Sequence, residues 1–514
     1  MAIKKLGVTV LSLALFNPSA WAGEKEDLEK LRGTTKGLIQ LLVEQGAITK
    51  EKSGELMSEI EKSPAETETP EEEVDKKTVR VPYVPETVKQ EMTEQIRKDV
   101  LAQAKREQWG KPGAIPDWAQ KIKWEGDLRL RSQGDMFQSD NATFFYKNYL
   151  EINRVGGDAN TNNPYLNTTE DRQRFRLRAR LSMLAEVTQG VTAAFRLATG
   201  SANDPVSTNQ TLGNMGNRFN FMLDQAYVKL EPYQWLTVAG GKIPNPWFGT
   251  DLVWDEDLNF DGAAVQFKPR IGNELVWFST LGAFPLQEIE LSKKDKWLYG
   301  AQTGVDWNRS QFRARFGVAY YDYQNITGQI NTAPGSHLLD FTAPQFVQKG
   351  NTMFDISQTQ NQNLYALASE YKELNITANL DIYTFSPVHV TLTGDYVKNV
   401  GFKKEDIVRR TGRDVGQQNQ AYMGRVAVGM PRIKHRHDWQ VFGGYKHLES
   451  DAVLDAFTDS DFHLGGTNAK GWIAGGSYGV ATDTWLTLRW LSADQIVGPP
   501  LAIDVMQLDL NVRF

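Results

Sequence analysis

Four arginines recur at every second position in one short stretch of this sequence: Arg174, Arg176, Arg178 and Arg180. This spacing matches the two-residue repeat of a β-strand, which points alternate side chains to the same face. The guanidinium groups would then lie about 6.6 Å apart, twice the rise per strand residue. Because arginine stays charged at every working pH, such a row concentrates anions nearby. The stretch therefore predicts a charged surface that interacts with anions.

A second group of charges is acidic and falls in a loop-like segment from Pro244 to Asp257. Its carboxylates are Asp251, Asp255, Glu256 and Asp257. Two interpretations stay open. The segment folds against a basic surface, which makes these carboxylates candidate constriction residues. Alternatively, it is an ordinary exposed loop with Trp247 and Trp254 packed at its base.

Residue types for enzymatic chemistry are poorly represented. The chain has no cysteine, which excludes disulfides, Cys–zinc sites, iron–sulfur clusters and cysteine nucleophiles. His435 and His437 stand beside Lys434 and Arg436, and these cations disfavour a divalent metal, so we expect a solvated turn. Ser477 misses the G-x-S-x-G spacing, although a Ser–His pair assembled by the fold stays open. We predict no enzyme, no metal and no cofactor.

The segments that carry these charges alternate apolar and polar residues. At the carboxyl end, Met506, Leu508, Leu510, Val512 and Phe514 fall on one face, and Gln507, Asp509, Asn511 and Arg513 fall on the other. Such segments are about ten residues long, and short turns alternate with long polar loops between them. The pattern predicts an all-β fold, a transmembrane antiparallel β-barrel in the outer membrane of a Gram-negative cell. A soluble sandwich or β-solenoid is the alternative.

Sixteen strands are predicted from this alternation. They lie near 123–137, 172–186, 191–200, 221–230, 235–243, 261–268, 274–282, 297–307, 312–323, 375–385, 388–398, 420–430, 439–449, 470–480, 485–492 and 504–514. Counting 364–371 as a further strand would break the alternation of short and long connections, so this segment is assigned to a long outer loop, 324–374. Eighteen strands is the main alternative, because bacterial single-chain barrels use even strand numbers.

The region before the barrel (123–514) divides into four parts. Residues 1–22 combine Lys4-Lys5, an apolar stretch and Ala20-Trp21-Ala22, which predicts a cleaved signal peptide. Residues 23–63 have helical periodicity and are predicted to be periplasmic, 64–85 form an acidic Pro-rich linker, and 86–110 form a charged helix with coiled-coil character. With a net charge of −6 and a pI near 5.7, nucleic acid is not expected as a partner.

The basic face of the predicted strands is assigned to the lumen. The predicted pore-lining cations are Arg129, Arg131, Arg174, Arg176, Arg178, Arg180, Arg196, Lys268, Arg313, Arg315, Arg425 and Arg489. Facing them are Glu125, Asp127, Asp306, Asp381, Asp395 and Asp509. A basic wall in an acidic chain favours anion preference; the alternative is a basic wall that merely faces an acidic loop.

Several features together resemble the proteobacterial family of putative porins. They are the signal sequence, the helical start at Leu38–Thr49, the charged linker, Gly240–Pro246 followed by Asp257–Ala264, and Gly394–Asn399. The resemblance implies passive diffusion of small hydrophilic solutes through a barrel that is monomeric or a homotrimer. General porins fold their third outer loop into the barrel, and the acidic segment is the third outer loop by position.

The terminal Phe514 resembles the signature by which the outer-membrane assembly machinery recognises its clients; the alternative is an ordinary strand residue. Outer-membrane lipid and the assembly machinery are thus expected partners. A second function stays open, in which the barrel is only an anchor and residues 24–110 bind peptidoglycan or a periplasmic partner.

Overall fold

The computed structural model describes residues 121–290 and 292–514. The predictions for residues 1–22, 23–63, 64–85 and 86–110 lie outside these residues. Within the part that the structure describes, no helix is long and apolar enough to cross a lipid bilayer.

Residues 121–290 and 292–514 contain sixteen long strands, as predicted. The strands are β1 (Ile122–Phe137), β2 (Arg172–Thr188), β3 (Val191–Ala198), β5 (Met222–Tyr233), β6 (Leu236–Pro244), β7 (Asn259–Phe267), β9 (Leu275–Gln287), β10 (Lys296–Asn308), β11 (Phe312–Gln324), β14 (Lys372–Ile382), β15 (His389–Asn399), β16 (Gln420–Gly429), β17 (Trp439–Leu448), β18 (Ala469–Ala481), β19 (Thr484–Gln495) and β20 (Ala502–Arg513). Two short strands, β4 (Gln210–Thr211) and β8 (Arg270–Ile271), extend the same sheet.

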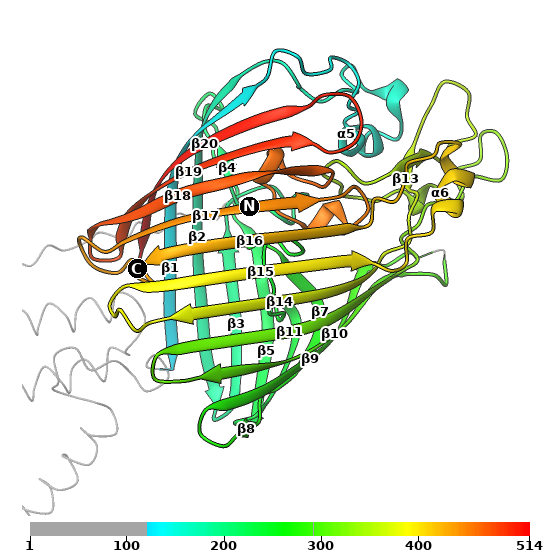
Figure 1. Ribbon diagram of the computed structural model, residues 1–514. Coiled ribbons are helices and arrows are strands. Elements are labelled where there is room, and N and C mark those ends of the chain that lie inside the picture. The colour runs from blue at the N-terminus through cyan, green and yellow to red at the C-terminus, as the bar shows by residue number, and fades with distance from the viewer. Residues whose placement is uncertain (1–120, 291) are drawn as a thin grey trace, which may run out of the picture. The chain divides into compact units, whose positions relative to one another are not determined.

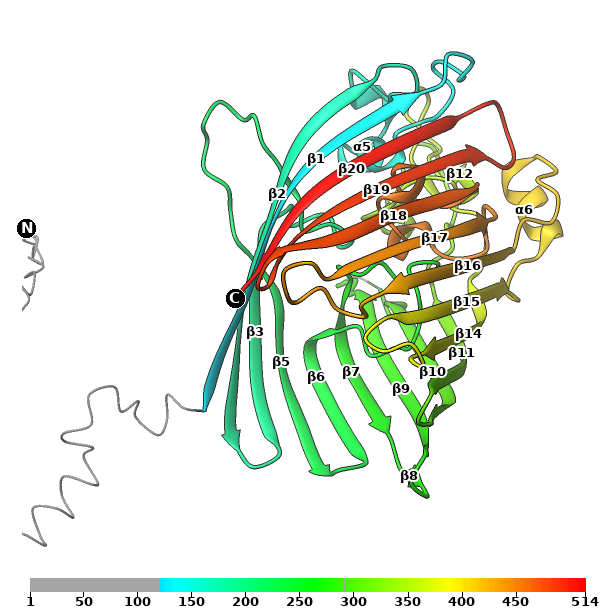
Figure 2. The same cartoon turned by 60° about the vertical axis from the view of Figure 1, so that its left-hand side comes forward.

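The sheet closes on itself into an antiparallel barrel (Figure 1). Each long strand pairs with its neighbours in the chain, and the first strand, β1, also pairs with the last, β20, with Leu130 opposite Leu510. Figure 2 shows β1, β2 and β20 side by side at this closure. Because the barrel is closed, it exposes no sheet edge to lipid, where unpaired backbone N–H and C=O groups would find no hydrogen-bond partner.

The two faces of the barrel differ in polarity, as the alternation predicts. On β20, Met506 and Leu508 are 46% and 48% exposed, whereas Gln507 and Asp509 are 0% and 4% exposed. Apolar side chains on other strands are exposed in the same way, including Phe175, Leu223, Val228, Leu281, Phe316, Leu392, Val426, Val441 and Leu488. The exterior is therefore apolar, as in a barrel surrounded by lipid, whereas the interior holds both polar side chains and a buried apolar cluster that includes Phe284, Leu298 and Tyr321.

The connections differ in length between the two ends of the barrel. Long loops occupy one end and contain α5 (Tyr149–Arg154), η1 (Asp158–Asn160), η2 (Asp340–Thr342), α6 (Lys404–Thr411), η3 (Asp455–Phe457) and η4 (Phe462–Leu464). The hairpin β12 (Met353–Asp355) and β13 (Tyr365–Leu367) forms a separate two-stranded sheet in one of these loops. Residues 364–371 thus contribute no barrel strand, as predicted.

The last residue lies beside β1. Phe514 donates from its backbone N–H to the carbonyl of Gly126 at 3.0 Å and accepts from the N–H of Gly126 at 2.7 Å. Its ring lies where a side chain at position 126 would stand. Glycine at this position therefore lets the terminal aromatic ring pack across the closing strand. Recognition of Phe514 by the assembly machinery stays a prediction.

Candidate functional site

The loop between β6 and β7, residues 245–258, lies inside the barrel. Its Phe248 N–H donates to Gln302 Oε1 on β10 at 2.8 Å, and Thr250 Oγ1 donates to Asp395 Oδ2 on β15 at 2.6 Å. A loop that leaves β6 reaches both of these strands only by crossing the interior of a closed barrel. The structure thus places the four candidate constriction residues in the interior.

Aromatic side chains hold this loop in place. Trp247 and Trp254 are buried, and both pack edge-on against Tyr321 of β11, with ring centroids 5.1 Å and 4.9 Å apart. Trp247 also contacts Phe284 of β9, and Trp254 contacts Phe260 of β7. Burial of large rings is the main apolar contribution to docking. The two tryptophans belong to the interior core and do not simply pack at the base of an exposed loop.

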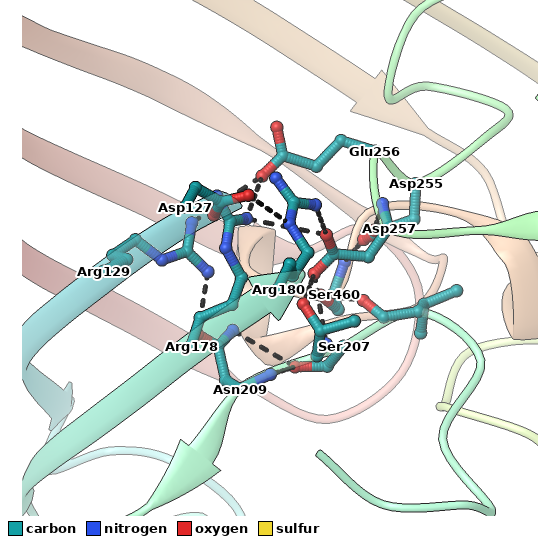
Figure 3. A network of polar contacts seen from close by, with 12 residues as sticks. Asp127, Arg129, Arg178, Arg180, Ser207, Asn209, Asp255, Glu256, Asp257 and Ser460 are labelled. Carbon is teal, nitrogen blue, oxygen red and sulfur yellow. Dashed lines mark hydrogen bonds and ion pairs between the residues drawn. The ribbon is translucent and has the colours of Figure 1, made fainter. Parts of the chain in front are cut away.

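The acidic end of the loop meets two arginines of the predicted row (Figure 3). Arg180 Nε lies 2.7 Å from Asp127 Oδ2, and Arg180 Nη1 lies 3.1 Å from Asp257 Oδ1. Arg178 lies 3.1 Å from Asp127 Oδ1 and 3.5 Å from Asp257 Oδ1. Two wall cations therefore share one wall carboxylate and one loop carboxylate.

Two neighbouring carboxyl groups of the loop meet opposite electrostatic surroundings. Asp257 accepts from the N–H and hydroxyl of Thr208 at 3.1 and 2.9 Å. Burial would raise the pKa of Asp257, but the charges of Arg178 and Arg180 outweigh it and lower that pKa below 3.8. Among the residues that the structure describes, Asp255 accepts only from backbone N–H groups, including that of Ser460 at 2.9 Å. Burial, with repulsion from nearby carboxylates, raises the pKa of Asp255 well above its usual range.

Glu256 stands apart from these buried groups, because its side chain is 73% exposed. Its Oε1 lies 3.6 Å from Arg178 Nη1 and 3.7 Å from Arg129 Nη1. Arg129 also donates to Asn209 Oδ1 at 2.7 Å. The loop therefore presents one accessible carboxylate opposite two wall guanidiniums.

On the side of the loop toward β16 and β17, a further set of charges surrounds Lys446. Its ammonium lies 2.8 Å from Asp459 Oδ2 and 3.4 Å from Asp251 Oδ1. A small cavity here is lined by these groups together with Arg425 and Arg489. Arg425 stacks over Phe442, and it forms no ion pair within the described residues. Asp251 is thus partly neutralised by a lysine that the sequence analysis did not identify.

A second charged centre was not predicted. Asp461, in the loop before β18, lies 3.0 Å from Arg131 Nη1 and 2.5 Å from Arg489 Nη2. Arg131 also pairs with Asp509 at 2.7 Å. Burial opposes ionisation of Asp461, but the charges of Arg131 and Arg489 lower its pKa well below the usual range. No periodicity marks a carboxylate in an irregular loop, so the sequence carried no signal for it.

The remaining predicted cations lie in separate parts of the barrel. Arg174 pairs with Asp135 at 2.6 Å, Arg196 with Asp224 at 2.5 Å, and Arg313 with Asp306 at 2.5 Å. Arg315 stacks over the rings of Phe248 and Phe278. Lys268 lies one residue beyond β7, in a short turn. Asp135 shares a face of β1 with Arg129 and Arg131, so the two-residue repeat could have identified it as an interior residue. Most wall arginines are therefore neutralised locally.

No cluster of three or more His, Asp or Glu side chains suited to a metal ion occurs among residues 121–290 and 292–514. The arrangement is a barrel interior crossed by a docked loop, with charges of both signs beside that loop.

Comparison with known proteins gives a family match over almost the whole chain. Residues 32–514 match the family model described as "Putative porin". No curated protein sequence matches the chain.

Among solved structures, the chain is similar to OprB of Pseudomonas putida, with 10% identity, a TM-score of 0.44, and coverage of 77% of this chain and 95% of that chain. It is similar to the outer membrane channel DcaP of Acinetobacter baumannii, with 9% identity, a TM-score of 0.40, and coverage of 76% and 97%. It is also similar to the anion-selective porin from Comamonas acidovorans, with 10% identity, a TM-score of 0.39, and coverage of 76% and 99%.

Proposed function

This chain belongs to the putative porin family, and we propose that small hydrophilic solutes diffuse passively through its barrel with a preference for anions. The family assignment and the barrel together make the protein an outer-membrane channel. The observation that carries the proposal is the interior loop that brings Glu256 to Arg129 and Arg178 (Figure 3). Glu256 is accessible, so solutes that pass it experience both signs of charge at short range.

Two arginines without an ion-pair partner among the described residues support the anion preference. Arg176 and Arg425 form no ion pair with any described residue, whereas Asp257 and Asp461 are each bound by two arginines. A cation without a nearby carboxylate keeps its field in the passage, and a narrow low-dielectric wall focuses that field. Paired groups contribute little at a distance because their charges cancel.

The experiment is conductance of the purified protein in planar bilayers. Discrete ohmic steps are expected, with a reversal potential in a KCl gradient that shows chloride to be more permeant than potassium. The preference should shrink at high salt, because the Debye length falls from about 10 Å at 0.1 M to about 3 Å at 1 M. A correctly folded protein that gives no steps would contradict the channel. Steps with cation preference would contradict the selectivity alone.

A further inference from the structure

A cavity of about 340 Å³ lies at the long-loop end of the arginine row, between the wall formed by β20, β1 and β2 and the loops folded against it. Four cations line it, and Asp204 is the carboxylate among its lining residues. The cations are Arg172, Arg174, Arg176 and Lys349. The cavity is therefore basic, although Arg174 is paired with Asp135 and burial lowers the pKa of Lys349 to about 7.

Arg176 is a buried arginine of this cavity whose hydrogen bonds are weak. It donates to Gln133 Oε1 at 3.3 Å and to Ser207 Oγ at 3.4 Å, both long for hydrogen bonds from a guanidinium. Its buried Nε has no hydrogen-bond partner within the described residues. A buried donor without a partner is costly, and an anion in the cavity would relieve that cost.

Lys349 reaches the same cavity from the loop between β11 and β14. Its ammonium donates to the backbone carbonyls of His463 and Gly465. It forms no ion pair within the part of the chain that the structure describes. The ammonium and the Arg176 guanidinium thus come from different elements, and each lacks a carboxylate partner.

The other lining residues include both polar side chains, among them Gln133, Asn167 and Gln348, and apolar ones. Phe346, Leu464, Leu501 and Ile503 contribute an aromatic and aliphatic surface beside the cations. A ligand that uses the whole cavity needs an anionic group for the cations and a compact apolar body for this surface. Inorganic anions satisfy only the first requirement, and neutral aromatic compounds only the second.

We propose that this cavity binds small organic carboxylates that carry a compact apolar body, such as aromatic acids. The proposal deepens the proposed function by naming a class of solute. Passage of the ligand through the barrel rests on the proposed function, whereas binding of the ligand in the cavity does not. The cavity is lined by Arg172, Arg174 and Arg176 of β2, and the next arginine, Arg178, meets the interior loop. A captured carboxylate that moves inward therefore meets successive guanidiniums about 6.6 Å apart.

The test is binding of benzoate to the full chain in lipid nanodiscs, measured by saturation-transfer NMR. Millimolar benzoate should bind, and benzamide, its neutral counterpart of the same shape, should bind at least about tenfold more weakly because it cannot form charge-assisted hydrogen bonds. Inorganic phosphate should compete poorly. Equal binding of benzamide or equally effective competition by phosphate would overturn the proposal, and so would the absence of benzoate binding.

The residue variant is Arg176→Gln, which keeps a hydrogen-bonding side chain but removes the charge. Benzoate affinity should fall by about 10- to 100-fold, the range expected for loss of a charge-assisted hydrogen bond. Arg409→Gln is the matched control, because Arg409 lies on α6 and pairs with Asp406 away from the cavity. Equal loss of affinity in both variants would overturn the proposal. Ile503→Ser provides a second test through the apolar surface and should also weaken benzoate binding.

Conductance of the same preparations separates the two claims. Protein that binds benzoate but shows no conductance steps would contradict the channel and leave the binding site standing. Conducting protein without benzoate binding would contradict the binding site and leave the channel standing.

Discussion

The arginine row on β2 has two halves with different surroundings. Arg178 and Arg180 are bound by Asp127 and by Asp257 of the interior loop. Arg176 lies two residues from Arg178 on the same face and opens into a cavity; among the described residues its hydrogen-bond acceptors are Gln133 and Ser207 alone. Identical residues at identical spacing therefore serve different purposes. Arg178 and Arg180 fix the loop through its carboxylate, whereas Arg176 forms no ion pair with a described residue and remains available to solutes.

The largest effect is expected when the ion pairs of Arg178 and Arg180 with the loop are broken. Asp257→Asn removes the loop carboxylate that Arg178 and Arg180 share. Docking of the loop should weaken by about 3 kcal/mol, as for other buried ion pairs that lose one member. Single-channel conductance and hydrogen exchange of residues 245–258 should both increase.

Asp261→Asn is the control, because Asp261 forms an exposed pair with Lys242. An unchanged conductance in Asp257→Asn would show that the aromatic contacts alone hold the loop.

Charge reversal should distinguish the two halves directly. Arg176→Glu should shift the reversal potential toward cations without changing the temperature at which the barrel unfolds on gels. Arg178→Glu places a carboxylate beside Asp127 and Asp257, so it should shift the potential and also release the loop. The measurements are reversal potentials at low and high salt and heat-dependent gel migration. Identical behaviour of the two variants would contradict the division of the row.

Acid should affect the loop in two stages, because the pKa values of its carboxyl groups shift in opposite directions. Burial raises the pKa of Asp255, so its protonation stabilises the docked loop as the pH falls from neutral. The arginines lower the pKa of Asp257, so its contribution to docking is present above pH 3.8 and is lost as the pH falls through the lowered value. The protection factor of the loop amides, which corrects the exchange rate for its intrinsic pH dependence, should therefore rise and then fall during acidification.

Asp255→Asn should abolish the first stage and keep the second. A protection factor that falls from neutral pH downward in the unmodified protein would contradict the assignment of Asp255.

The smallest effect is expected at the aromatic end of the loop. Arg315→Gln removes the guanidinium from the rings of Phe248 and Phe278, and cation–π contacts of this kind contribute about 1 kcal/mol. Loop opening should increase slightly, with conductance almost unchanged. An effect as large as that of Asp257→Asn would mean that the loop is fixed mainly through its aromatic end.

The strands were predictable because their information is local. Alternation along 504–514 already separates Gln507 and Asp509 from Met506 and Leu508, and burial follows that division. The length difference between connections, in turn, identified sixteen strands and excluded 364–371. Period-two alternation and the need to close a sheet in lipid are sufficient for this level of description.

The charge state of the passage was not predictable, because it depends on contacts between distant segments. Arg131 and Asp461 are 330 residues apart, and Asp461 lies in a loop without periodicity. The sequence by itself determined which arginines share the interior face, because strand geometry places every second side chain there. Only the tertiary structure decided which of them are neutralised, because pairing requires a carboxylate within about 4 Å. That carboxylate comes from a neighbouring strand or from a loop whose path follows from packing across the whole barrel.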